Sequence, residues 1–233
     1  RQACARMLAA VVAALFISSS AAAENVTVVE LYTSQGCSSC PPADEMLGEM
    51  AKRDDIIALA LHVDYWDYIG WKDEFANPAF TARQKGYARA AGARSVYTPQ
   101  MIIGGQDHVI GTRPNEVAAH LVNHMAKAPS LEIEASRSGR VATVRAIALT
   151  TLGDEIAVHL VTYRPSSTVR IQRGENAGRT LDYSNVVTSW MQAEAWDGQG
   201  DYMLEAELPS DQPAVVLFQV PPHGEILGAA HIR

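Results

Sequence analysis

The chain has 233 residues and a formal net charge of −7, with 48% hydrophobic and 19% charged residues. This composition is typical of a folded globular protein and excludes a disordered chain, and the length fits one large domain or two small ones. An acidic chain without a Lys/Arg-rich tract lacks the basic face that nucleic-acid binding requires, so we expect no nucleic-acid partner.

Residues 1–23 follow the pattern of an export signal. Arg1 and Arg6 provide a positive start, Met7–Ile17 is an apolar core, and Ala21–Ala23 fits the small-residue cleavage pattern. The apolar core is shorter than the roughly 20 residues that span a bilayer, which argues against a membrane anchor. We therefore expect a periplasmic or secreted protein that begins near Glu24 and keeps no stable membrane anchor.

The next part of the chain, residues 24–128, alternates strand and helix signals. Apolar runs bounded by turn residues predict strands, and Asn77-Pro78 is a typical helix start. The predicted elements are a strand at Val26–Tyr32, a helix at Ala43–Ala51, a strand at Ile56–Val63, a helix from Asn77-Pro78 to Gly92, hairpin strands at Gln100–Ile103 and Asp107–Ile110, and a helix from Thr112 and Pro114 through Ala126. This order predicts an α/β domain.

Residues 129–233 have a different sequence pattern, in which short runs of alternating apolar and polar residues are separated by Gly, Pro, Asp and Asn. The predicted strands are Leu131–Ala135, Val141–Leu149, Ile156–Thr162, Tyr202–Leu208, Ala214–Val220 and Glu225–Ile232. Helical periodicity is nearly absent, so we expect an all-β, sandwich-like C-terminal domain packed closely against the first. Gly174–Arg179 lacks the Gly-Lys-Ser/Thr ending of a phosphate loop and is interpreted as a turn-rich loop.

Cleavage of the signal would remove Cys4 and leave two cysteines, Cys37 and Cys40, in a C-x-x-C motif. A structural disulfide closing so small a ring would contribute only about 2 kcal/mol, against about 4.7 kcal/mol for a 100-residue loop. A closed zinc site needs four ligands, and the sequence has no second C-x-x-C. A strand that leads the pair into a helix start favours the third interpretation, a redox dithiol.

The predicted helix assigns different roles to the two thiols. A helix N-terminus stabilises a thiolate and lowers its pKa. We therefore expect Cys37 to be the nucleophile and the more exposed cysteine, and Cys40, near the N-cap, to be the resolving thiol. Pro41-Pro42 fits the first helical turn, where backbone N–H groups have no partner in any case.

Two further pairs are candidate site residues. Thr98-Pro99 precedes a predicted strand. In thioredoxin-type folds a cis proline at this position lies beside the cysteines and offers its main chain to the substrate, although an ordinary trans bond is the default. His62 and Asp64 are two positions apart at the end of the second predicted strand, so the alternation of side chains along a strand places both on the same side. They could relay protons or tune the pKa of Cys37, or His62 could simply be a hydrogen-bonded structural residue.

Four segments together resemble one family: VELYTSQGCSSCPPAD (Val29–Asp44), HVDYWDYIGWKD (His62–Asp73), VYTPQMIIGG (Val96–Gly105) and RGENAGRTLDYSNVV (Arg173–Val187). It is the exported, thioredoxin-like family known as domain of unknown function 1223. The resemblance implies a thioredoxin-like domain followed by a β-rich part, and it implies no particular activity. The chain departs from ordinary thioredoxins in having Gln35-Gly36 before the first cysteine and a long insertion before Pro99.

The sequence thus predicts an exported thiol–disulfide oxidoreductase in which Cys37 attacks, Cys40 resolves and Pro99 orients the substrate. Its partner would be a protein or a small thiol, and the chemistry needs no cofactor. Two alternatives remain open. One is a non-catalytic metal-binding or metal-delivery protein using Cys37, Cys40 and His62, and the other is a partner-binding module in which the cysteines form a passive clip.

Overall fold

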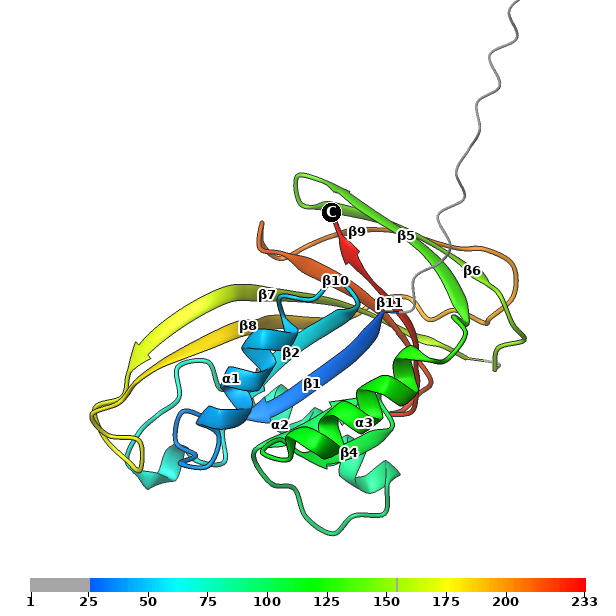
Figure 1. The fold of residues 1–233 in the computed structure, drawn as a ribbon. Helices are drawn as coiled ribbons and strands as arrows, with labels where there is room; N and C mark the ends of the chain where they lie inside the picture. The colour runs from blue at the N-terminus through cyan, green and yellow to red at the C-terminus, as the bar shows by residue number, and fades with distance from the viewer. Residues whose placement is uncertain (1–25, 154) are drawn as a thin grey trace, which may run out of the picture.

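The structure, a computed structural model, describes residues 26–153 and 155–233. It contains an eight-stranded mixed sheet, a three-stranded antiparallel sheet and helices on both faces of the larger sheet (Figure 1). Within the described residues, no helix is long and apolar enough to cross a membrane. The predicted export signal, residues 1–23, lies outside the described residues.

The first half of the chain confirms the predicted order of elements, with bounds shifted by a few residues. Its elements are β1 (Thr27–Thr33), α1 (Pro41–Met50), β2 (Ile56–His62), the short 3-10 helix η1 (Asp67–Ile69), α2 (Pro78–Ala90), β3 (Gln100–Ile103), β4 (Asp107–Ile110) and α3 (Pro114–Met125). The strands lie in the order β2-β1-β3-β4. β1 is parallel to β2 and antiparallel to β3, which in turn pairs antiparallel with β4.

Both faces of the central strands are covered, which explains why β1 and β2 are continuous apolar runs rather than alternating ones. Every residue of β1 and β2 is buried. Leu31 faces the layer formed by α1 and α3, while Tyr32 faces α2 and packs near Phe80. The loop that connects β1 to α1 therefore begins from a strand that is packed on both faces.

Helix α2 begins where the sequence predicts. Asn77 is its N-cap, in an extended conformation, and its side chain accepts a hydrogen bond of 2.9 Å from the N–H of Ala79. We expect Asn77→Ala to lower the free energy of unfolding by about 1 kcal/mol, because that N–H loses its acceptor. Urea denaturation would measure this loss, and Asn123→Ala, at an exposed position of α3, should stay within about 0.5 kcal/mol of the parent. An equal effect of both substitutions would contradict the prediction.

The second half consists of strands throughout. They are β5 (Leu131–Ser138), β6 (Val141–Ala148), β7 (Ala157–Arg170), β8 (Thr180–Gln192), β9 (Tyr202–Glu207), β10 (Ala214–Gln219) and β11 (Ile226–Ile232). β7 continues beyond its predicted end at Thr162, and β8 was not predicted. These two strands form a hairpin that runs as a long arm to the end of the sheet where α1 begins (Figure 1).

The two halves share one sheet, which differs from the two separate domains predicted to meet at residues 128 and 129. The strand order is β11-β10-β7-β8-β2-β1-β3-β4, so strands from the second half extend the sheet of the first. The junction is a parallel pairing of β8 with β2 at Val186 and Ala60. The smaller sheet, β5-β6-β9, packs on the β7, β10 and β11 end through a common apolar cluster. The second half thus contributes one small antiparallel sheet of its own and four strands of the large mixed sheet.

A buried ion pair also joins the halves. Glu30 on β1 accepts two hydrogen bonds from Arg83 of α2, at 2.7 and 2.8 Å. The Arg83 guanidinium also donates to Gln219 on β10 at 3.0 Å and lies over the Trp190 ring of β8, 3.8 Å from its centroid. Because both charges are buried and paired, this contact fixes α2 against strands from both halves.

Candidate functional site

The C-x-x-C motif occupies the connection between β1 and α1. Cys37 and Cys40 are joined by a disulfide with their Cα atoms 5.4 Å apart. Cys40 is the N-cap of α1, and Cys37 lies in the turn before it, as the sequence predicts. Pro41 and Pro42 occupy the first helical positions. The pair therefore lies at the positive end of the helix dipole, where a thiolate is stabilised.

The cysteines are more deeply buried than expected. Cys37, predicted to be the more exposed thiol, has 1% of its surface exposed and Cys40 has none, so the order is as predicted but both thiols are buried. Only Ser38 and Ser39 of the motif are exposed. The burial arises because segments distant in sequence pack on the loop, and the first of these is the segment around η1. A Cβ atom added at Gly36 would lie only 3.1 Å from the Cβ atom of Trp66.

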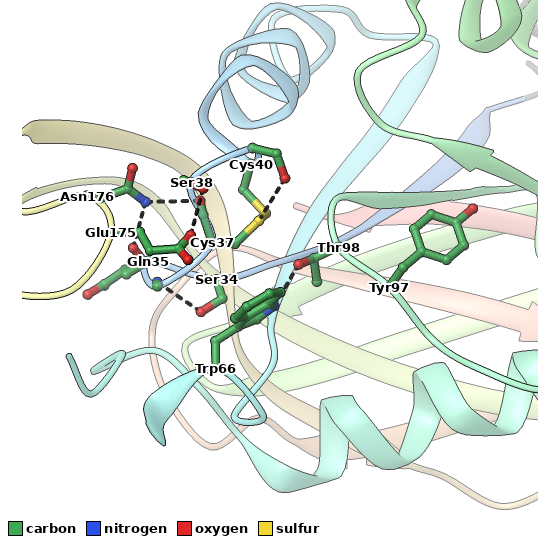
Figure 2. Close-up of a disulfide and its surroundings, with 12 residues drawn as sticks. Ser34, Gln35, Cys37, Ser38, Cys40, Trp66, Tyr97, Thr98, Glu175 and Asn176 are labelled. Carbon is green, nitrogen blue, oxygen red and sulfur yellow. Dashed lines mark hydrogen bonds between the residues drawn. A yellow bond between two sulfur atoms is a disulfide. The ribbon is translucent and has the colours of Figure 1, made fainter. Parts of the chain in front are cut away.

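The second covering segment is the connection between β7 and β8 (Figure 2). The side-chain amide of Asn176 donates to the carbonyl oxygens of Gln35 and Cys37, both at 2.9 Å, and the Ser38 hydroxyl donates to the Glu175 carboxylate at 2.6 Å. Sequence reasoning interpreted this connection as a turn-rich loop. The contacts join positions 139 apart in the case of Cys37 and Asn176, and no local pattern indicates them. The β-rich half thus contributes side chains to the site.

Thr98 and Pro99 lie at the same end of the sheet. The peptide bond between them is cis. The Thr98 hydroxyl oxygen accepts a 2.8 Å hydrogen bond from the Trp66 indole, and Figure 2 shows both residues next to the disulfide. A Cβ atom added at Gly111 would lie 3.0 Å from the Cβ atom of Ala43 in α1 and 3.1 Å from that of Pro99. Pro99 is thereby brought next to the first turn of α1.

His62 and Asp64 have different partners. His62 is completely buried, and its Nδ1 lies 2.7 Å from Asp73 Oδ2, the oxygen that also accepts the backbone N–H of Gln35 at 2.8 Å. His62 is therefore linked to the C-x-x-C loop through Asp73. Asp64 instead accepts a hydrogen bond of 2.6 Å from the Thr81 hydroxyl of α2.

A residue missed by sequence reasoning, Asp44, lies in the first turn of α1. It is buried, and neither of its carboxylate oxygens has a hydrogen-bond partner among the described residues. Burial raises the pKa of Asp44 to about 7, although the nearby charge of His62 and the Thr33 hydroxyl oppose this shift. The available signal was its spacing, since Asp44 lies one turn after Cys40 and three residues before Leu47 on the buried face of the helix.

Asp44 belongs to a group of buried polar atoms left without partners in the described part of the chain. The others near it are Thr33 Oγ1, His62 Nε2 and the Tyr183 hydroxyl. The rings of His62 and Tyr183 meet edge to face, with their centroids 4.9 Å apart. Unsatisfied buried polar groups are costly, so such a concentration beneath a disulfide points to a role other than stability.

The alternative metal site receives no support from this arrangement. Among residues 26–153 and 155–233, no three His, Cys, Asp or Glu side chains are grouped so that they could hold a metal ion. In the described state, Cys37 and Cys40 are bonded to each other, and one ring nitrogen of His62 is paired with Asp73.

The fold and the site define a mixed α/β protein with a disulfide-forming C-x-x-C motif between its first strand and first helix. The chain belongs to the family described as "Protein of unknown function (DUF1223)", whose model matches residues 28–219. This confirms the family that the sequence motifs indicate.

Two solved structures are similar to this chain over most of its length. Protein AGR_C_4864 from Agrobacterium tumefaciens is 31% identical, with a TM-score of 0.75 over 90% of this chain and 95% of that one. HBP35 of Porphyromonas gingivalis is 14% identical, with a TM-score of 0.59 over 89% of this chain and 74% of that one, so this likeness concerns the fold alone. A search of curated proteins found no match.

Proposed function

We propose that this protein is an exported thiol–disulfide oxidoreductase built on a thioredoxin-like unit. The strand order β2-β1-β3-β4 supports the thioredoxin-like assignment, as do the position of the C-x-x-C motif before α1 and of Pro99 before β3. The observation that carries the function is the Cys37–Cys40 disulfide at a helix N-terminus, one turn from the buried and unpartnered carboxyl of Asp44.

In the first step of the proposed reaction, the Cys37 thiolate attacks one sulfur of a substrate disulfide. A bond forms between Cys37 Sγ and that sulfur, and the other substrate sulfur leaves as a thiolate. The N-terminus of α1 stabilises the attacking thiolate, because the first turn of a helix presents N–H groups and a positive dipole end. The product is a mixed disulfide between Cys37 and the substrate.

In the second step, Cys40 loses its proton and attacks Cys37 Sγ. The Cys37–Cys40 bond forms, the substrate leaves as a second thiolate, and two electrons have passed from the protein to the substrate. Asp44 is the candidate acceptor of the Cys40 proton, since it lies one turn along the same helix and its pKa of about 7 suits proton exchange near neutral pH. The same steps in reverse oxidise a substrate dithiol.

Access to the disulfide determines which substrates can react. Because Cys37 and Cys40 are almost completely buried, a substrate must approach between Ser38, the Thr98-Pro99 segment and Trp66. The main chain of Thr98 and Pro99 would align an extended substrate there. This favours a dedicated protein or small-thiol partner over general reduction of exposed disulfides.

The proposed location follows from residues 1–23 and from the chemistry. Disulfides persist in the periplasm and outside the cell, where a C-x-x-C pair can cycle with thiol partners. Fractionation of cells that produce the full-length protein would test export, with N-terminal sequencing of the mature form expected to begin near Glu24.

The redox potential of the pair tests the enzyme assignment. We expect thiol trapping across defined dithiol/disulfide buffers to give a reversible midpoint between about −270 and −120 mV, the range of known oxidoreductases. A midpoint well below about −300 mV would identify an inert structural disulfide and would favour the partner-binding module instead.

A further inference from the structure

We propose that Asn176, on the connection between β7 and β8, is a positioning residue for the Cys37–Cys40 pair and sets its reduction potential. This inference rests on the proposed redox function. The sequence indicates only a turn-rich loop for the segment that contains Asn176, and the strands it connects belong to the β-rich half of the chain.

The contacts of Asn176 are directed at the C-x-x-C loop. The residue is 1% exposed. Its amide nitrogen donates hydrogen bonds to the carbonyl oxygens of Gln35 and Cys37, and its amide oxygen accepts a 2.9 Å hydrogen bond from Arg179. The Cys37 carbonyl also accepts the Cys40 N–H at 3.2 Å, so Asn176 supports the turn that carries both sulfur atoms.

The segment that carries Asn176 is itself held in place. Ile171 donates its N–H to the Arg179 carbonyl at 2.9 Å and accepts the Gly178 N–H at 2.8 Å, which closes the end of the hairpin. Gly174, with φ +77°, lies against Trp71, and an added Cβ atom there would be 3.3 Å from the Cβ atom of Trp71. The Asn176 amide is therefore presented from a fixed point rather than from a loose loop.

The oxidised and reduced proteins depend on Asn176 to different degrees. In the oxidised protein, the bond between Cys37 and Cys40 fixes the loop covalently, and the Asn176 hydrogen bonds add to a constraint that already exists. In the reduced protein that bond is gone, and the loop keeps its shape over the helix N-terminus only through non-covalent contacts. Loss of the Asn176 amide should therefore destabilise the reduced protein more, which makes the pair harder to reduce.

The test is a redox titration of Asn176→Ala in the full-length protein, with glutathione buffers as the probe. We expect the equilibrium constant for reduction to fall about tenfold, which corresponds to a midpoint about 30 mV more negative for a two-electron couple. Asn176→Asp keeps the shape and the Arg179 contact but has no donor, so its midpoint should also fall. Gln172→Ala, an exposed position on the same connection, is the matched control and should keep the parent midpoint.

Thermal unfolding of each variant in both redox states separates positioning from ordinary structural support. Positioning predicts a larger loss of Tm in the reduced form than in the oxidised form. Equal losses in both forms with an unchanged midpoint, or a midpoint that moves to more positive values, would overturn the inference. If Asn176→Ala does not fold, Arg179→Ala removes only the contact that orients the amide, and a smaller shift in the same direction is expected.

Failure of this inference is distinguishable from failure of the proposed function. A parent protein that titrates between about −270 and −120 mV, with Asn176 variants that titrate identically, removes the role of Asn176 and leaves the function intact. If the parent pair stays oxidised throughout that range, both the role of Asn176 and the proposed function are contradicted.

Discussion

Cys40→Ser is expected to accumulate as a mixed disulfide with its partner, whereas Cys37→Ser is expected to accumulate none. With Cys40 replaced, Cys37 can still attack a substrate disulfide, but no second thiol is present to release the product. With Cys37 replaced, the thiol that makes the first attack is lost and the first step cannot occur. Turnover of a disulfide substrate should fall to the uncatalysed rate in both variants.

The mixed disulfide can be captured directly. Each variant is produced in cells with residues 1–23 present, and the cells are treated with acid to quench exchange. The proteins are then alkylated and separated on non-reducing gels, and partners are identified by mass spectrometry. The variant with both cysteines replaced is the control for non-covalent association. Covalent partners found on Cys37→Ser and not on Cys40→Ser would reverse the assigned roles, and persistence of biological function in Cys37→Ser would favour the partner-binding module.

Local elements of this fold could be predicted because they depend on local patterns. The predicted bounds of β3 and β4 coincide with those of the structure, since a pair of glycines, Gly104 and Gly105, separates two short apolar runs and both adopt positive φ. Asn77 likewise marks the start of α2 through its own side chain. Each of these signals lies within a few residues of its effect.

The unpredicted strand β8 shows where local patterns fail. Leu181 and Tyr183 alternate as a strand should, but Asn185 has φ +48° and the alternation does not continue through it. The joining of the halves is also non-local, because β8 meets β2 in a single residue pairing, Val186 with Ala60. A sequence pattern shows that a strand is apolar on one or both faces, but it does not identify the neighbouring strand.

Some features of the candidate site could likewise be predicted from the sequence, and others could not. Cys37, Cys40 and Pro99 could be found because their spacing and neighbours are visible in the sequence. The burial of Cys37 could not, since it is produced by Trp66 and by Asn176 from other segments. The chemistry of the motif can thus be read locally, while its accessibility and support depend on tertiary packing.

Asp44 carries the prediction with the largest effect on stability. Its pKa is raised from 3.8 to about 7 by burial, so the folded protein holds a proton that the unfolded chain releases between these values. The contribution of Asp44 to stability should therefore fall as the pH rises from about 4 to about 7 and should change no further above that range. At 1.36 kcal/mol for each pKa unit, the cost of the ionised carboxylate is about 4 kcal/mol.

Asp44→Asn removes this ionisation with little change of shape. Its free energy of unfolding should equal that of the parent near pH 4 and exceed it by up to about 4 kcal/mol at pH 8. Urea denaturation of the oxidised proteins measures the difference, because the disulfide keeps both cysteines from titrating. Glu45→Gln, at the neighbouring exposed position, is the matched control and should depart from the parent far less, because the Glu45 charge is the smallest of the causes that shift the pKa of Asp44. A pH-independent effect of Asp44→Asn would mean that Asp44 does not titrate in this range.

The same substitution should slow the proposed reaction, although it makes the protein more stable. Without the Asp44 carboxylate, the Cys40 proton loses its proposed acceptor, and general-base assistance of this kind is worth about 10²-fold or more. We expect release of the mixed disulfide, followed in single turnovers at pH 7, to slow by about that factor, and the deficit to shrink above a pH of about 8.5, where a free thiol ionises unaided. Greater stability with undiminished release would show that the buried carboxyl does not serve the dithiol, whereas greater stability with slow release would explain why an unpartnered acid is kept beneath Cys40.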